Sequence, residues 1–290
     1  MSKPITTEPI FGKMRKAYII LSIIVSAALL QGCEKVITLD FNDAEPKLVV
    51  EAIISDGPGP YTVQLNESAG FYESNVFPAR EGATVRIMDD LGNEETLIEV
   101  SPGIYQTINL QGELGRTYTL LIESEDEIYT ATSTMPSVVV PVDTLVIEYI
   151  PENLFQDEGL YCYAYATDPA GIANYYRYNM FVNGAPYITY PENSTDPLDG
   201  KEDDNFYLSD DKYFDGNQID IEFPNLLLIG DTVDIELHNL DKGTYDYYRT
   251  LVEAIYGGGV APANPISNFG DSALGYFGAI SIQSRQMVVE

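Results

Sequence analysis

Apolar and polar residues alternate in short runs from about residue 47 to residue 135. A two-residue period places apolar side chains on one face of an extended strand and polar side chains on the other. Turn-forming sequences separate the runs, among them a hairpin turn at 89–93 in which Gly92 is expected to adopt a positive φ. Seven short strands at this spacing, with no helical period, predict an antiparallel β-sandwich of immunoglobulin-like or transthyretin-like size.

The segment 135–142 has a proline near each end and is therefore expected to be extended. We place a domain boundary there, between an N-terminal β-sandwich domain at 33–137 and a C-terminal β-rich domain at 138–290. Within the second domain, the acid-rich stretch 196–215 is expected to form a long exposed loop. Strands are expected at 144–149, 160–167, 175–182, 218–223 and 232–240, with one or two more after residue 274.

One segment breaks the β pattern. Tyr245, Tyr248 and Val252 recur at spacings of three and four residues, which places them on one stripe of a helix. Asp241 is a suitable N-cap, and the glycines at 257–259 are expected to end the helix. The sequence therefore predicts one amphipathic helix near 241–256 in an otherwise mainly β protein.

The first 32 residues have the features of an export signal. Basic residues precede an uncharged apolar run at 17–30, which is shorter than the ~20 residues that a membrane span needs. The sequence Leu30-Gln31-Gly32-Cys33 resembles the lipobox of bacterial lipoproteins, whose cysteine is lipidated and becomes the mature N-terminus. We therefore expect a signal peptide at 1–32 and lipidation of Cys33. The alternative is an uncleaved anchor helix with a chance cysteine, and both place the remaining chain outside the cytoplasm, tethered to a membrane.

The chain has a formal charge of −30, and the expected mature part is more acidic still. Removal of residues 1–32 takes away four basic residues and one acid, which leaves 11 basic and 44 acidic residues and a charge of −33. Such a surface repels phosphate backbones and anionic headgroups. The charge therefore argues against nucleic-acid binding, and the lipid anchor would have to hold the protein at the membrane.

With Cys33 assigned to the lipid, Cys162 is the only other cysteine, so an intrachain disulfide is excluded. Cys162 lies in a run where small residues alternate with tyrosines. This pattern favours a small buried residue on a strand over a reactive nucleophile. Stability is therefore expected to come from packing alone.

An ordered set of segments resembles the Bacteroidota outer-membrane lipoprotein family catalogued as domain of unknown function 4249. The segments are CEKVITLD at 33–40, PKLVVE at 46–51, GPYTV at 59–63, GRTYTL at 115–120, ATSTMP at 131–136, DPAG at 168–171, NYYR at 174–177 and LGYFG at 274–278. The resemblance covers nearly the whole mature chain. It implies a lipid-anchored outer-membrane protein, often encoded near a TonB-dependent transporter, and it brings no catalytic residues.

Three short segments match an Asp-Ser/Thr-aliphatic pattern that resembles the O-glycosylation acceptor of this bacterial group. They are Asp143-Thr144-Leu145, Asp231-Thr232-Val233 and Asp271-Ser272-Ala273. Thr144, Thr232 and Ser272 are therefore candidate glycosylation sites.

His238 is the only histidine of the chain and shares the expected outer face of a strand with Asp234 and Glu236. A zinc site needs several nitrogen or sulfur ligands, and no nucleophile-elbow pattern occurs in the sequence. We therefore expect a solvated surface histidine among acids, and we assign no catalytic residue.

Acidic residues in the expected loop are weak calcium candidates, because hard cations prefer several oxygen ligands. These candidates are Asp199, Asp203, Asp211 and Asp215. Asp211, Asp215, Gly216 and Glu222 also match positions of an EF-hand loop, but the flanking residues alternate as in strands. A hairpin turn at Asp215-Gly216 explains the sequence better, and the principal expectation is that the protein uses no metal or cofactor.

Tyrosines are the most promising side chains for recognition. Tyr161, Tyr163 and Tyr165 share one face of an expected strand, and Arg177 lies among further tyrosines on a neighbouring one. Because Tyr and Arg are enriched at binding hot spots, these four residues form the candidate binding surface, in the second domain. The alternative is that one of these two tyrosine faces packs beneath the helix stripe at Tyr245, Tyr248 and Val252 and fills an interdomain core.

The absence of a catalytic constellation, together with the resemblance, favours a non-enzymatic accessory or ligand-binding lipoprotein that acts beside a TonB-dependent transporter. The side of the outer membrane on which it acts stays open. A cell-envelope structural or adhesion protein is the first alternative, and a hydrolase with paired carboxylates is the second.

Overall fold

Short strands form in the first half of the chain, where the alternating pattern predicts them. The computed structural model describes residues 45–69, 77–154, 157–187, 207–256 and 263–290. The strands of this half are β1 Leu48–Ser55, β2 Thr62–Glu67, β3 Thr84–Asp89, β4 Glu94–Thr96, β5 Ile98–Ser101, β6 Ile104–Gln106, β7 Thr117–Ser124 and β8 Glu127–Thr134. Burial alternates along β1 and β8, and Gly92 in the turn between β3 and β4 has a φ of +86°, as predicted.

The second half adds further strands and a helix. They are β9 Thr144–Ile150, β10 Gly159–Thr167, β11 Tyr175–Val182, β12 Ala185–Pro186, β13 Tyr207–Asp210, β14 Gln218–Leu227, β15 Thr232–Leu240, α2 Lys242–Tyr256 and β16 Leu274–Val288. The expected fold class, mainly β with one amphipathic helix near 241–256, is confirmed for the described residues. The acid-rich stretch 196–215 is not a loop throughout, because β13 pairs with β11 and Tyr207 packs against the neighbouring core.

Within the described residues, hydrogen bonds join the strands into three sheets. One has the order β4-β3-β7-β8, and a small sheet has the order β14-β10-β9. The third, which we call the long sheet, runs β12-β11-β15-β16-β1-β2-β6-β5, with β13 also paired to β11. Each of the two shorter sheets encloses a hydrophobic core against one part of the long sheet.

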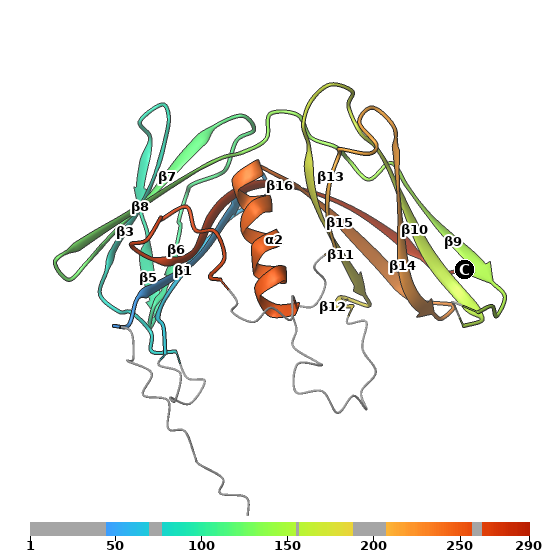
Figure 1. The fold of residues 1–290 in the computed structure, drawn as a ribbon, viewed down its shortest axis with the longest axis horizontal. Coiled ribbons are helices and arrows are strands. Elements are labelled where there is room, and N and C mark those ends of the chain that lie inside the picture. The colour runs from blue at the N-terminus through green and yellow to red at the C-terminus, as the bar shows by residue number, and fades with distance from the viewer. Residues whose placement is uncertain (1–44, 70–76, 155–156, 188–206, 257–262) are drawn as a thin grey trace, which may run out of the picture. The chain divides into compact units, whose positions relative to one another are not determined.

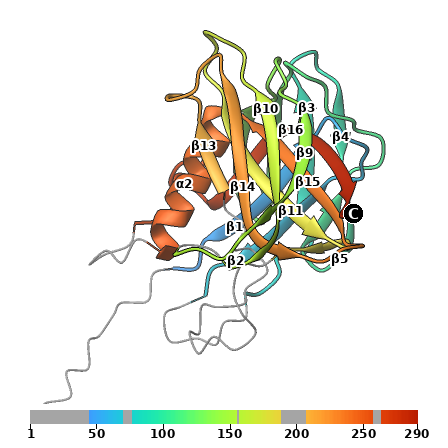
Figure 2. The same cartoon turned by 90° about the vertical axis from the view of Figure 1, so that its right-hand side faces the viewer.

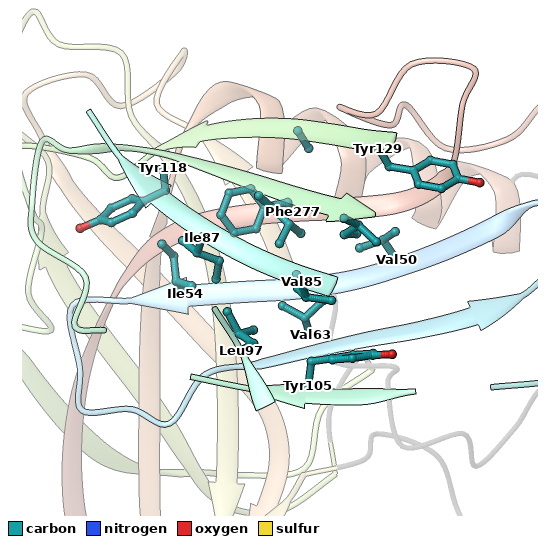
Figure 3. Packing of buried hydrophobic residues seen from close by; sticks show 14 of the residues in the cluster. Val50, Ile54, Val63, Val85, Ile87, Leu97, Tyr105, Tyr118, Tyr129 and Phe277 are labelled. Carbon is teal, nitrogen blue, oxygen red and sulfur yellow. The ribbon is translucent and has the colours of Figure 1, made fainter. Parts of the chain in front are cut away.

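The last strand joins the two parts of the long sheet. β16 pairs with β1 in parallel, with Ala52 opposite Phe277, and its later residues pair antiparallel with β15. Phe277 is fully buried in the first core, among residues from β1, β2, β3 and β7 (Figure 3). The sequence predicts closing strands in this region, but the expected antiparallel sandwich did not include a parallel neighbour for β1.

The domain boundary at residue 137 stays a prediction. The two cores separate close to that position, since Met135 belongs to the first core and Val140 to the second. The sequence after residue 138 nevertheless contributes to both, because Phe277 packs in the first core and Val289 in the second.

Helix α2 covers the face of the long sheet that points away from the cores (Figures 1 and 2). The predicted N-cap is present: the Asp241 carboxylate accepts a hydrogen bond from the Thr244 N–H at 2.6 Å. Gly278 of β16 lets the helix approach closely, since a Cβ there would lie 3.2 Å from the Thr244 hydroxyl. The helix therefore packs directly on the strand that joins the two parts of the sheet.

Candidate functional site

The four predicted recognition residues do not form one surface. The tyrosines lie on β10 in the small sheet, whereas Arg177 lies on β11 in the long sheet. The predicted common face of Tyr161, Tyr163 and Tyr165 is present, because the small residues between them point into the second core. Strand pairing is set by distant parts of the chain, so the sequence could not separate Arg177 from this face.

The tyrosines of β10 also differ in exposure. Tyr161 is only 4 % exposed, and its hydroxyl donates to the carbonyl oxygen of Asp157 at 2.8 Å. Tyr163 and Tyr165 are half-buried, and burial raises the pKa of the Tyr163 hydroxyl, with a further contribution from the neighbouring Glu222 carboxylate. The alternative, in which one of the two tyrosine faces packs beneath the helix, fits the face of β11: the ring centroids of Tyr175 and Tyr245 lie 5.1 Å apart, and Arg177 contacts the Tyr248 ring. The tyrosine face of β10 is not among the main contacts of α2, which packs on β16, β11, β13 and β15.

The helix covers a different set of side chains. Alternation along β1 and β16 turns Glu51 and Tyr276, which are opposite each other in register, away from the first core. β16 pairs with β15, and β15 pairs with β11, so that Arg177 on β11 lies on the same face of the long sheet. Three strands that are far apart in sequence thus present polar and aromatic side chains to α2.

A pocket of about 230 Å³ lies where α2 meets this face. We call it the α2 pocket, and its main lining residues are Glu51, Arg177, Tyr247, Tyr248, Leu251 and Tyr276. Helical spacing puts Tyr247, Tyr248 and Leu251 on the side of α2 that faces the sheet. The pocket is therefore built jointly by the helix and by strands of both parts of the long sheet.

Aromatic contacts fix the walls of the α2 pocket. The rings of Tyr247 and Tyr276 stack with centroids 5.0 Å apart and an interplanar angle of 24°. The guanidinium carbon of Arg177 lies 4.8 Å from the centre of the Tyr248 ring, which is a cation–π contact. These contacts hold the side chains in place before any partner binds, which reduces the entropy cost of binding.

The hydroxyls of Tyr247 and Tyr276 in the pocket stay protonated at neutral pH. Burial raises the pKa of Tyr247 to about 12, with a smaller contribution from the Glu51 carboxylate. Burial also raises the pKa of Tyr276, and Asp241 adds to the shift. The pocket can therefore offer neutral hydroxyl groups, aromatic ring faces, a guanidinium and a carboxylate to a ligand.

His238 lies on the same face of the long sheet as Arg177, opposite it in register. Its ring nitrogen Nε2 is 2.9 Å from the Glu236 carboxylate and 3.2 Å from the Asn179 amide. The hydrogen bond with His238 lowers the pKa of Glu236, and Asn179 and Arg177 contribute to the shift. The predicted shared face with Glu236 is present, but the expected solvated histidine is wrong, since His238 is only 7 % exposed.

Sequence reasoning missed Glu51, Tyr247 and Tyr276 as members of the site. The two-residue period of β1 shows that Glu51 points away from the core, and the spacing in α2 gives the side on which Tyr247 lies. Neither pattern reveals that β1 and β16 are neighbours, because their pairing closes a loop of more than 200 residues.

The remaining predicted residues take separate places. Cys162 is buried, as expected, and burial raises the pKa of its thiol to about 12, so the reactive thiolate is scarce at neutral pH. Thr144 and Ser272 are exposed, whereas Thr232 is half-buried at the start of β15. Glycosylation of these three hydroxyls stays a prediction.

The predicted calcium candidates are only partly within the described chain. Asp199 and Asp203 lie outside it, as does Cys33. Asp211 and Asp215 lie in the turn between β13 and β14, so strands and not EF-hand helices flank this segment. The expected hairpin at Asp215-Gly216 is wrong, because β13 pairs with β11 and β14 pairs with β10. The structure adds Asp168, which the sequence did not single out, and carboxylate oxygens of the three aspartates lie within 4.8 Å of one another.

Among the described residues, no helix is long and apolar enough to cross a membrane. No curated protein matches the chain. The model of one protein family, described as domain of unknown function (DUF4249), matches residues 34–286. Because this match spans most of the 290 residues, the chain belongs to the DUF4249 family.

Proposed function

We propose that this chain is a non-enzymatic lipoprotein of the outer membrane that binds a protein partner through the α2 pocket, with a TonB-dependent transporter as that partner. The observation that carries the proposal is the pocket itself, in which the aromatic rings and a guanidinium are held by their mutual contacts. Tyr and Arg are the side chains most enriched at hot spots of protein interfaces.

The size of the pocket favours a side chain of a protein as its occupant. A volume of about 230 Å³ is below the roughly 300–1,000 Å³ typical of pockets for drug-sized ligands. It accommodates a group about as large as one long side chain. The tyrosine rings that line the pocket suit a lysine or arginine of the partner, which can make cation–π contacts with them.

The charge of the chain supports a partner with a basic surface. A charge of −33 on the expected mature chain attracts positively charged patches over distances of about a Debye length and raises association rates. Such attraction acts on the rate of encounter, whereas contacts with the rings of the pocket would determine how long a complex lasts.

Lipid anchoring requires Cys33, so the Cys33→Ser variant is expected to leave the membrane fraction and to lose incorporation of labelled fatty acid. The matched control is Cys162→Ala, because Cys162 is buried in the second core and is expected to keep both properties. Membrane partitioning and acyl labelling of the two variants measure the effect. If Cys33→Ser stayed acylated and membrane-bound, the lipoprotein assignment would be wrong.

A pull-down from gently solubilised outer membranes tests the partner. The wild-type chain is expected to bring down a β-barrel transporter, and Tyr248→Ala is expected to reduce recovery by at least about tenfold, since a hot-spot side chain contributes about 2 kcal/mol or more. The double variant Tyr163→Ser/Tyr165→Ser is the control, because it removes two half-buried tyrosines from the small sheet and leaves the pocket intact.

Each outcome of the pull-down supports or contradicts the proposed binding surface or the accessory role. Loss of the partner in Tyr248→Ala, with an unchanged melting temperature, supports the α2 pocket. Loss only in the Tyr163→Ser/Tyr165→Ser variant would move the binding surface to the small sheet. Absence of any β-barrel partner from the wild-type sample would contradict the accessory role and favour a structural or adhesion protein.

A further inference from the structure

Three carboxylates from two separate turns converge at one end of the second core. Asp168 follows β10, and Asp211 and Asp215 lie between β13 and β14. Their oxygens lie within 4.8 Å of one another, although Asp168 is only 2 % exposed and Asp211 only 9 %. The cluster shares no residue with the α2 pocket.

Hydrogen bonds orient the cluster and leave some of its oxygens available. The Asp168 carboxylate accepts from the Tyr176 hydroxyl and from the Gly216 N–H. One oxygen of Asp211 accepts from the Asn174 N–H at 2.7 Å, and one of Asp215 accepts from the Gly171 N–H at 2.6 Å. The second oxygen of Asp211 and of Asp215 accepts no hydrogen bond from the described chain.

No positive side chain balances these charges within the described residues. None of the three aspartates forms an ion pair with a described lysine, arginine or histidine. Carboxylates that are close together and partly buried repel one another, and this repulsion costs more at low local dielectric than in water. A bound cation would remove that cost.

The side chain of Asn174 gives evidence for a ligand that is independent of the three carboxylates. Its side chain is only 8 % exposed, and its amide oxygen Oδ1 is buried without a hydrogen-bond partner. The Asp211 N–H donates to the Asn174 carbonyl oxygen and continues the β11–β13 register, so the two residues are directly opposite. Side chains of directly opposite residues project from the same face of a sheet. The Asn174 N–H also donates to the Asp211 carboxylate, so the unpartnered oxygen belongs to a residue in direct contact with the cluster.

We propose that Asp168, Asp211 and Asp215, with the amide oxygen of Asn174, bind a Ca²⁺ ion that fastens the turn after β10 to the turn between β13 and β14. All of these ligands are hard oxygens, which calcium prefers and zinc does not. Two oxygens that share one ion can be separated by at most about 4.6–5.2 Å for Ca²⁺ but only about 4.0–4.2 Å for Mg²⁺. The oxygens of the three aspartates lie within 4.8 Å of one another, which is compatible with one shared Ca²⁺. Mg²⁺ usually keeps several waters and is seldom held by protein oxygens alone, so four protein ligands favour Ca²⁺.

Terbium luminescence and thermal melting of the full chain in detergent test this proposal. Tb³⁺ is expected to show emission sensitised by Tyr176, whose hydroxyl bonds to Asp168, and Ca²⁺ is expected to displace it with half-saturation at about 0.1–1 mM, as in extracellular calcium modules. Ca²⁺ at 10 mM is expected to raise Tm by about 4–8 °C relative to EDTA. Mg²⁺ at 10 mM is expected to raise it by less than half as much.

The Asp215→Asn variant removes one charge from an exposed position and keeps an acceptor for Gly171, so it is expected to fold and to weaken Ca²⁺ binding at least tenfold. Asp220→Asn, an exposed acid on β14 outside the cluster, is the matched control and is expected to bind as the wild type does. Equal terbium emission and equal Ca²⁺-dependent Tm shifts in the two variants would overturn the site. An equal effect of Mg²⁺ would overturn the preference for calcium.

Asn174→Asp distinguishes an ion site from a purely structural cluster. A fourth carboxylate is expected to lower Tm in EDTA, because it adds repulsion, and to increase the Tm gain on addition of Ca²⁺ above that of the wild type. A lower Tm that Ca²⁺ does not restore would show that Asn174 is not a ligand and would overturn its place in the proposal.

Discussion

Replacement of Gly275 with alanine is expected to lower the free energy of unfolding by about 4–5 kcal/mol, a loss seen only when a mutation breaks a specific structural requirement. A Cβ at Gly275 would lie 1.9 Å from the carbonyl oxygen of Val50, which is far inside van der Waals contact. Gly275 also has a φ of +86°, where a side chain adds strain. The three nearest atoms all belong to the Val50 main chain and cannot rotate away, so β1 and β16 must separate to relieve the clash.

Gly184→Ala is the matched control for Gly275→Ala. Gly184 has a φ of +79°, but a Cβ there would meet nothing within 4 Å. Its replacement is therefore expected to cost only the backbone strain, about 1–2 kcal/mol. Urea unfolding of both variants gives the comparison, and similar losses would show that β16 does not lie against β1 as the structure places it.

The Asp241→Ala variant is expected to lose about 2–4 kcal/mol of stability, because its carboxylate bonds directly to α2 and β8 and is linked to β16 through Ser133. One oxygen caps α2 through the Thr244 N–H, and the other accepts from the Ser133 hydroxyl at 2.9 Å and from the Thr134 N–H at 3.2 Å. The Ser133 hydroxyl in turn accepts from the Ala279 N–H of β16 at 2.8 Å. An N-cap contributes about 0.5–2 kcal/mol, and hydrogen bonds to a charged group contribute about 1.5–3 kcal/mol.

A double-mutant cycle with Ser133→Ala measures how strongly Asp241 couples the helix to β8. The coupling energy is expected to exceed about 1 kcal/mol, because both groups are partly or fully buried. Lys242→Ala is the control on the same turn of α2: its ion pair with Asp246 is exposed, so its loss is expected to change stability by less than about 0.5 kcal/mol. Additive effects of Asp241→Ala and Ser133→Ala would show that the link between β8 and α2 contributes no stability.

Gly275→Ala and Asp241→Ala both act on contacts that the sequence alone does not indicate. Asp241 is recognisable from the sequence as an N-cap because capping is a local property of the first helical turn. Its bonds to Ser133 and Thr134 join residues more than 100 positions apart, and they depend on where α2 packs. The same residue thus has one role set by local sequence and another set by the fold.

The sequence by itself determined most of the elements of this protein, although β13 lies in the stretch that was expected to be a loop. The two-residue period fixed which side chains of β1 and β10 face a core, and the three- and four-residue spacing fixed α2, because both periods are properties of a single strand or helix. Turn residues such as Gly92 marked where strands end, since few residues adopt a positive φ. The ordered family segments also indicated membership of the DUF4249 family, which the match over residues 34–286 confirms.

Only the tertiary structure decided which elements are neighbours. In the structure, β16 lies parallel to β1, and Arg177 contacts the helix instead of the tyrosines of β10. Asp168 lies close to Asp211 and Asp215. An alternating pattern states which face of a strand is buried, but it is equally satisfied by many partner strands. The choice among them depends on how all the apolar faces are buried together, so both the α2 pocket and the aspartate cluster become visible only in the folded chain.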